Sequence, residues 1–149
     1  MTEKPRTLIT TRDVYAVKRQ MASMWIGRGP RVAELEKRMA AWVGATYGVV
    51  FGSGTAALTV ALHNTGATGV RIPPIDCDAL HIAARAADMK VTEHGSVDIT
   101  VYPERGGEIE DFARHLPRER EVMLRGRFGV FSFGALKDVT GGIGGCLVA

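Results

Sequence analysis

Residues 47–62 constrain the fold of this chain more than any other segment. The short apolar run Tyr47 to Phe51 ends in the turn Gly52-Ser53-Gly54-Thr55, which passes into the alanine-rich run Ala56 to Leu62. A short apolar run bounded by glycine is typical of a buried strand, and glycine marks the turn that follows it. The segment therefore predicts a strand, a glycine turn and a helix in direct succession.

The same alternation continues along the chain. Before it, apolar residues spaced by three and four predict a helix over residues 12–24, opened by Thr10 or Thr11, and Pro30 begins a second helix that Gly44 ends. After it, strands are predicted at 69–73, 90–93, 97–102, 121–124, 130–133 and 146–149, and helices at 78–87, capped by Asp78, and 108–115. Strands that alternate with helices indicate an α/β fold, a three-layer sandwich with a mainly parallel sheet, preceded by two N-terminal helices.

Composition limits the domain count and the class of partner. The 149 residues, 46% hydrophobic and 23% charged, are enough for one domain over 1–149 and too few for two. The net charge of +3 is scattered, which argues against nucleic acid as a partner. No apolar stretch is long enough to span a bilayer, and residues 1–10 contain no apolar region of the kind that a secretory signal has, so a cytoplasmic protein with no membrane partner is expected.

The cysteines and histidines predict no metal site. Cys77 and Cys146 lie far apart with no CxxC spacing, so both are expected to be free thiols. None of the histidines has the spacing of a ligand pair; they are His63, His81, His94 and His115. The acidic segment Glu104 to Asp111 is interpreted as a solvated loop and the start of a helix.

The turn at Ser53-Gly54-Thr55 is a candidate anion site. A helix N-terminus offers free backbone N–H groups and the positive end of the helix dipole, glycine allows close approach, and the hydroxyls of Ser53 and Thr55 add donors. Tight turns between a strand and a helix need glycine and a hydroxyl cap without any ligand as well. Taken alone, the turn leaves both interpretations open.

Lys137 is a candidate nucleophile. It follows the apolar run Phe131 to Leu136 and precedes a glycine-rich segment at 141–145, surroundings that remove water from an amine and lower its pKa. Such a lysine attacks aldehydes. The alternative is a surface lysine that pairs with the neighbouring Asp138.

Together these features resemble the DegT/DnrJ/EryC1/StrS sugar aminotransferases. The matching residues are Trp25 to Pro30, Glu34, Glu36, Gly44-Ala45, Ser53 to Leu58, Ile72 to Pro74, Gly126 to Phe133 and Lys137. The resemblance implies the large domain of a fold-type-I enzyme that uses pyridoxal 5'-phosphate (PLP). It implies that Ser53, Gly54, Thr55, Ala56 and Ser132 bind the cofactor phosphate, and that Lys137 forms the Schiff base and moves the proton. It also implies a homodimer or higher homo-oligomer.

The sequence departs from the family pattern at three places. No aspartate is recognised at the end of a strand to pair with the pyridine nitrogen, and the stretch that carries it is interpreted as deleted before Phe128; Glu119 or Glu121 are the substitutes considered. Cys77 stands where the family places an aromatic ring. The chain ends at Ala149, where the family continues into a second, smaller domain.

Two functions remain open at this stage. The first is a PLP-binding aminotransferase that acts on a keto-sugar or a similar carbonyl compound. The second is a catalytically inactive family remnant that serves as a structural, assembly or split-enzyme subunit with a heterologous partner chain.

Overall fold

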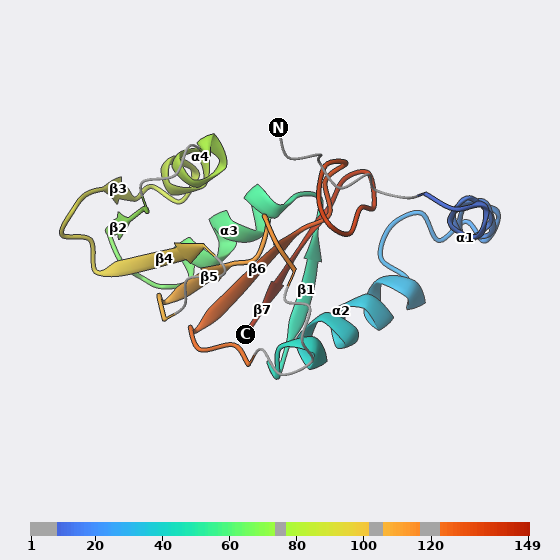
Figure 1. Ribbon diagram of the computed structural model, residues 1–149, viewed down its shortest axis with the longest axis horizontal. Helices are drawn as coiled ribbons and strands as arrows, with labels where there is room; N and C mark the ends of the chain where they lie inside the picture. Colours follow the sequence, from blue (N-terminus) through green and yellow to red (C-terminus); the bar gives the residue numbers. More distant parts are fainter. Residues whose placement is uncertain (1–8, 74–76, 102–105, 117–122) are drawn as a thin grey trace, which may run out of the picture.

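The computed structural model describes residues 9–73, 77–101, 106–116 and 123–149 (Figure 1). Its helices are α1 (Thr11–Ala22), α2 (Pro30–Trp42), α3 (Gly54–His63) and α4 (Asp78–Ala86). Its strands are β1 (Gly48–Phe51), β2 (Gly69–Arg71), β3 (Lys90–Val91), β4 (Val97–Val101), β5 (Ile109–Asp111), β6 (Phe128–Ser132) and β7 (Gly145–Val148). The predicted α/β class and both N-terminal helices are confirmed.

All seven strands form one sheet in the order β1-β7-β6-β5-β4-β2-β3. The pairs from β3 to β6 are parallel, whereas β7 is antiparallel to both β1 and β6. The sheet is therefore mainly parallel, as predicted. Among the described strands, antiparallel pairing is confined to β7, which lies between β1 and β6.

Two apolar clusters cover opposite faces of the sheet. On one face α3 and α4 pack over the strands, and Leu62 and Leu80 meet Ile109 and Val130 with almost no exposed surface. On the other face α2 lies over β1 and β7, and Val43 joins a cluster with Phe112, Phe131, Cys146 and Val148. Figure 1 shows α2 beside β1 and α3 in front of the central strands.

Helix α1 begins at a well-formed cap but buries nothing. The Thr10 side chain accepts a hydrogen bond from the Asp13 backbone, and the Asp13 carboxylate accepts one from the Thr10 N–H at 2.8 Å. This reciprocal arrangement satisfies two backbone donors at the start of the helix. No residue of α1 is buried, and the helix lies apart from the sheet, beyond α2 (Figure 1).

The structure corrects the prediction of a helix at 108–115. Ile109–Asp111 is a strand, β5, paired with β4 on one side and β6 on the other. Its charged residue Glu110 is fully buried and accepts hydrogen bonds from the backbone N–H groups of Gly106 (3.2 Å) and Arg125 (3.1 Å). Sequence patterns assign charged residues to solvent, so they do not predict a buried carboxylate whose charge is compensated by hydrogen bonds from two loops.

Smaller differences lie at element ends. Met123 and Leu124 belong to no strand, and the remainder of the strand predicted at 121–124 lies outside the described residues. Helix α4 has Cys77 at its N-cap, without a side-chain hydrogen bond, and Asp78 is its first residue instead of its cap. Strand β2 ends at Arg71, short of the predicted Pro73.

The connection from β4 to β5 is short for two parallel strands. Residues 102–108 form it, whereas parallel strands are usually joined by a dozen or more residues that include a helix. Gly107 is pressed against β4: a Cβ there would lie 2.8 Å from the carbonyl oxygen of Asp98, and its N–H donates to Thr100 Oγ1 at 3.3 Å. The described part of the crossover thus runs directly over this face of β4.

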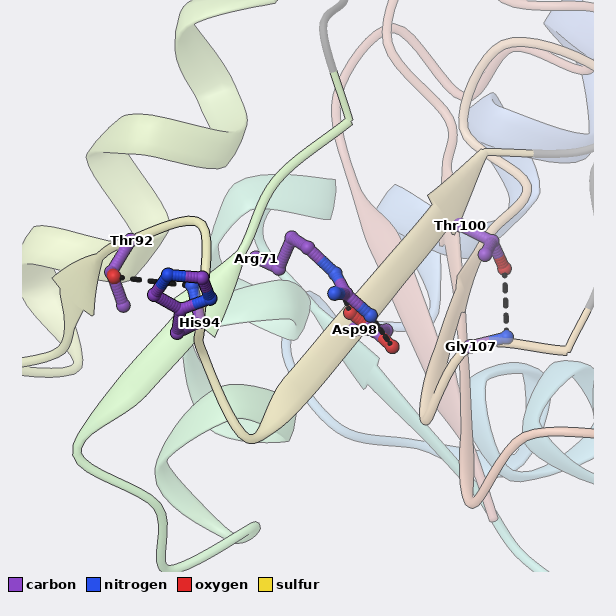
Figure 2. Close-up of polar contacts among 6 residues, drawn as sticks. All are labelled: Arg71, Thr92, His94, Asp98, Thr100 and Gly107. Carbon is purple, nitrogen blue, oxygen red and sulfur yellow. Dashed lines mark hydrogen bonds and ion pairs between the residues drawn. The ribbon is translucent and has the colours of Figure 1, made fainter.

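Polar side chains lie on that same face of β4 (Figure 2). Val97 and Ile99 point into the core under α3 and α4, while Asp98 and Thr100 alternate with them on the other side. The Arg71 guanidinium binds both carboxylate oxygens of Asp98, at 2.5 and 2.6 Å. This alternation is typical of a strand with one solvated face, so β4 is polar where a doubly covered parallel strand would be apolar.

Candidate functional site

One cavity at an edge of the sheet is lined by residues from α3, α4, β5 and β6 and from the loops after the two strands. Strands β5 and β6 are parallel, so their carboxyl ends lie at the same edge, where ligands of open α/β sheets bind. Asp111 comes from the end of β5, and Ser132 and Lys137 come from the end of β6 and the loop after it. Gly54 and Thr55 come from the first turn of α3.

The N-terminus of α3 opens onto this cavity. Ser53 is its N-cap, and Ser53 Oγ accepts a hydrogen bond from the Ala56 N–H at 3.1 Å. The Ala57 N–H is bound to the Ser53 carbonyl oxygen, so the first-turn N–H groups of Gly54 and Thr55 remain without an intrahelical acceptor. Gly54 and Thr55 line the cavity, whereas Ser53 and Ala56 lie next to it and shape the turn.

A glycine contact sets the distance between α3 and β6. A Cβ on Gly54 would lie 2.8 Å from Ser132 Cβ and 3.1 Å from Ser132 Oγ. Only glycine therefore lets the helix N-terminus approach the end of β6 this closely. The Ser132 hydroxyl thus lies beside the N-terminus of α3.

Lys137 lies in a tight loop after β6. Its backbone N–H donates to the Gly134 carbonyl oxygen at 3.0 Å, and its side chain is half-buried and lines the cavity. The neighbouring Asp138 turns toward the loop after β5, where Oδ2 accepts from the Leu116 N–H at 3.1 Å and lies 3.9 Å from His115 Nδ1. Asp138 thus ties the lysine loop to the end of β5.

Asp111 corrects the prediction that a strand-end aspartate is missing. It is the last residue of β5, only 6% exposed, and lines the same cavity as Lys137. Its Oδ1 accepts a hydrogen bond from the Ala113 N–H at 2.7 Å. Burial raises the pKa of the Asp111 carboxyl, and that hydrogen bond and the charges of Lys137 and Arg114 oppose the rise.

The sequence missed Asp111 for an identifiable reason. The acidic pattern of Glu104 to Asp111 favours a solvated loop and the start of a helix. The sequence therefore does not place Asp111 at the end of a strand. The signal that could have found it is the spacing of Ile109 and Asp111 after the glycines Gly106 and Gly107. Residues two apart lie on the same face of a strand, so a strand here would place the aspartate on the same face as the apolar Ile109. Glu119 and Glu121, the substitutes considered, lie outside the described residues.

The two cysteines differ in their surroundings. Both are free, as predicted. Cys77 is half-buried at the start of α4 and lines the cavity, so the thiol does stand next to the candidate site. Cys146 is buried in β7, and burial raises the pKa of its thiol to about 11, which keeps it protonated and unreactive.

Two negative findings apply to the described residues alone. No group of three or more His, Cys, Asp or Glu side chains among them is arranged to hold a metal ion. None of the helices formed by these residues has the length and apolar character needed to cross a bilayer.

The first half of the chain is similar in sequence to known proteins. Residues 8–74 match the model of the DegT/DnrJ/EryC1/StrS aminotransferase family. The spore coat polysaccharide biosynthesis protein SpsC of Bacillus subtilis is 41% identical over 59 residues, which are 40% of this chain and 15% of SpsC.

Solved structures share the fold over nearly the whole chain. The PLP-form of Spr1654 from Streptococcus pneumoniae superposes with a TM-score of 0.83 at 19% identity, covering 99% of this chain and 52% of that one. DesI, solved in the presence of its TDP-sugar product, gives a TM-score of 0.80 at 23% identity, over 99% of this chain and 50% of DesI. The chain therefore spans about half the length of these structures.

The fold is that of these solved structures, with a mainly parallel sheet and a lysine near the carboxyl ends of its strands. The sequence match is confined to the first half of the chain. Over residues 8–74 the chain is similar to the DegT/DnrJ/EryC1/StrS aminotransferase family.

Proposed function

We propose that this chain binds PLP in the cavity beside Lys137 and acts in transfer of an amino group to a keto-sugar. One observation carries the proposal: Lys137, Asp111, Ser132 and the N-terminus of α3 all line a single cavity. These are an amine, a buried carboxylate, a hydroxyl and a helix N-terminus, and each of them matches a different part of the cofactor.

The residues present fit the cofactor. The first turn of α3, with its free N–H groups and the Ser132 hydroxyl beside it, suits a phosphate. The Asp111 carboxylate is 6% exposed and lines the cavity, and its Oδ1 accepts a hydrogen bond from the Ala113 N–H at 2.7 Å. A buried carboxylate that lines the cavity suits a protonated ring nitrogen, which would offset the cost of its burial.

Each residue then has a defined task. When bound, PLP supplies an electron sink that stabilises negative charge on the substrate carbon. Lys137 Nζ would hold the cofactor at its aldehyde carbon and would carry the proton to and from the substrate carbon. The Asp111 carboxylate keeps a proton on the ring nitrogen, and the α3 N-terminus with Ser132 fixes the phosphate end.

The relatives support a sugar as the acceptor. SpsC is named for polysaccharide biosynthesis, and the DesI structure holds a TDP-sugar product. This chain spans about half of DesI, so the surface that would recognise a sugar is not identified on it. The substrate class therefore rests on these names and on the shared fold.

We further propose that the active form is a homodimer. Large apolar side chains are exposed just before, on and just after α1: Ile9, Val14, Tyr15, Val17, Met21, Met24, Trp25 and Ile26. An apolar surface of this extent marks an interaction site in a water-soluble protein. A second copy is the occupant that a shared active site in this family implies.

Reductive trapping tests cofactor binding. The purified protein is incubated with PLP, reduced with borohydride and digested, and the modified residue is located by mass spectrometry. We expect a PLP adduct at Lys137 and none in Lys137→Ala. The matched control is Lys37→Ala on the exposed surface of α2, which should keep the adduct. An unmodified Lys137 in the wild type would refute the proposal.

A second measurement separates an aminotransferase from an inactive subunit. Addition of an amino donor to the loaded protein should convert the bound cofactor to its amine form, with a corresponding change in absorbance. A cofactor that stays bound but never changes would favour the inactive subunit, which the half-length match to the solved relatives makes worth testing.

A further inference from the structure

Arg114 lies in the cavity but has no task in the proposed function. It follows Asp111 by three residues, in the loop at the carboxyl end of β5. Its side chain lines the same cavity as Lys137, yet it is exposed where Asp111 is buried, which puts it at the mouth. Among the residues that the structure describes, no hydrogen bond or ion pair of the Arg114 side chain is found.

The charges around the cavity are unbalanced. Apart from the Cys77 thiol, its described lining holds three ionisable side chains: Asp111, Arg114 and Lys137. The two cations both act on Asp111, because each lowers the pKa of that carboxyl against the effect of burial. The described lining thus holds two cationic side chains and one carboxylate, and that carboxylate already accepts the Ala113 N–H. The mouth therefore favours an anion from solution.

The phosphate end of the cofactor does not fill this role. The N–H groups of α3 and the Ser132 hydroxyl form the phosphate position, and they come from other elements than Arg114. Arg114 instead shares the Asp111 loop, which Asp138 ties to the Lys137 loop through the Leu116 N–H. The guanidinium is thus held on the same pair of loops as the reacting amine.

We propose that Arg114 forms a carboxylate subsite at the mouth of the cavity, where it binds the carboxylate of an amino-acid donor. This inference rests on the proposed function. An α-amino acid carries its amino group and its carboxylate on one carbon, so a donor whose nitrogen reaches the atom held by Lys137 brings its carboxylate close by. A guanidinium fork matches a carboxylate with two parallel hydrogen bonds and stays charged at any working pH.

Binding of an unreactive carboxylate tests the subsite. Glutarate, which lacks an amino group, is titrated into the PLP-loaded and the cofactor-free protein by calorimetry, with its neutral diamide as the probe control. We expect Arg114→Gln to weaken glutarate binding at least about tenfold, since charge-assisted hydrogen bonds contribute roughly 1.5–3 kcal/mol and 1.4 kcal/mol is tenfold. The diamide should bind poorly to every form.

Arg85→Gln is the matched control. Arg85 is an exposed arginine on α4 that does not line the cavity, so its replacement should leave glutarate affinity unchanged. Arg114→Gln should also keep the melting temperature and the borohydride-trapped adduct at Lys137, because the residue is exposed and belongs to a different element from the helix that holds the phosphate.

The outcomes separate this subsite from the proposed function. Unchanged glutarate affinity in Arg114→Gln, no glutarate binding by the wild type, or equal binding of the diamide would each overturn the subsite, even with an adduct at Lys137. Weaker glutarate binding in the variant would support it, even if Lys137 formed no adduct and the cofactor proposal fell.

Discussion

At the scale of residues, Asp111 carries a cost that its site has to offset. It is buried at the end of β5, and its pKa is raised because burial disfavours the charged form more than Ala113, Lys137 and Arg114 favour it. Functional sites are where such shifts concentrate. In the cofactor-free protein no described residue fully compensates the free-energy cost of burying the charged carboxylate. Asp111 therefore lowers the free energy of unfolding of the cofactor-free protein.

Asp111→Asn should therefore stabilise the cofactor-free protein at neutral pH. The folded pKa lies above the ordinary value of 3.8, so the penalty is absent below about pH 3.8, grows as the pH rises through the folded pKa, and is complete above it. Asn keeps an oxygen for the Ala113 N–H without the charge. We expect a melting temperature roughly 2–4 °C higher than wild type at pH 7, the shift that about 1 kcal/mol gives in a chain of this size.

The difference from wild type should vanish as the pH approaches 3.8. Asp98→Asn is a suitable control, because that carboxylate forms an exposed ion pair with Arg71 and its loss should change stability little at any of these pH values. A constant offset between Asp111→Asn and wild type across the pH range would contradict the assignment of the cost to ionisation.

At the scale of elements, the site depends on how closely α3 approaches β6. The contact is a glycine against a serine at the end of a strand, with a hypothetical Cβ 2.8 Å from Ser132 Cβ. Backbone on both sides leaves little freedom for this pair to separate: Ser53 caps the helix, and Ser132 is paired with Gly145 of β7. The phosphate position is thus built by packing between two elements and does not belong to the turn alone.

Gly54→Ala tests this contact. The added methyl must displace either the start of α3 or the end of β6, so we expect a loss of about 1–3 kcal/mol in the free energy of unfolding. PLP affinity should also fall at least about tenfold, because the N–H groups and the Ser132 hydroxyl would no longer converge. Denaturant titration and fluorescence titration with PLP measure the two effects.

Gly52→Ala provides the comparison. A Cβ at Gly52, two residues earlier in the same turn, would meet nothing within 4 Å. This variant should retain both stability and PLP affinity. Equal losses of stability and PLP affinity in the two alanine variants would contradict the prediction. They would show that any glycine in the turn matters, and not the contact of Gly54 with Ser132.

At the scale of the whole molecule, the described residues form two apolar clusters on opposite faces of one sheet and leave apolar side chains of α1 exposed. The sheet is covered by α3 and α4 on one face and by α2 over β1 and β7 on the other, while β4 presents Asp98 and Thr100 on the face that its short crossover follows. A polar strand face needs no cover. Helix α1 is the opposite case, since its apolar side chains are exposed and it touches the body little.

Val17→Asp combined with Met21→Asp should break the proposed homodimer. These side chains are 59% and 62% exposed and lie one turn apart on α1. Each apolar side chain that becomes buried contributes about 1.5–3 kcal/mol, so charges at both positions should raise the dimer dissociation constant at least about a hundredfold. Native mass spectrometry over a concentration series reports the change.

Lys18→Glu, between the two positions on the sequence, is the control for a change of charge on α1. It should leave the dimer intact. A wild type that is monomeric at every concentration, or a double variant that dimerises as wild type does, would show that α1 is not the interface between copies.

The sequence by itself determined the elements whose pattern is local. Helices α1, α2 and α3 and strands β1 and β6 follow from apolar spacing, a cap residue, Pro30 and the glycine turns. The resemblance to the family rests on motifs at Ser53 to Leu58, Gly126 to Phe133 and Lys137, and the family model matches residues 8–74. These features act between near neighbours in the chain, so they can be recognised without knowledge of the packing.

Only the tertiary structure decided β5 and, with it, the carboxylate of the site. Ile109, Phe112 and Leu116 are spaced as on a helix, yet Ile109 packs under α3 and Phe112 stacks on Phe131 across the sheet, with ring centroids 4.9 Å apart. Pairing with β4 and β6 and the burial of Glu110 outweigh the local preference of so short a segment. The position of Asp111 beside Lys137 depends on that pairing, because parallel strands bring their ends to one edge only once the sheet has formed.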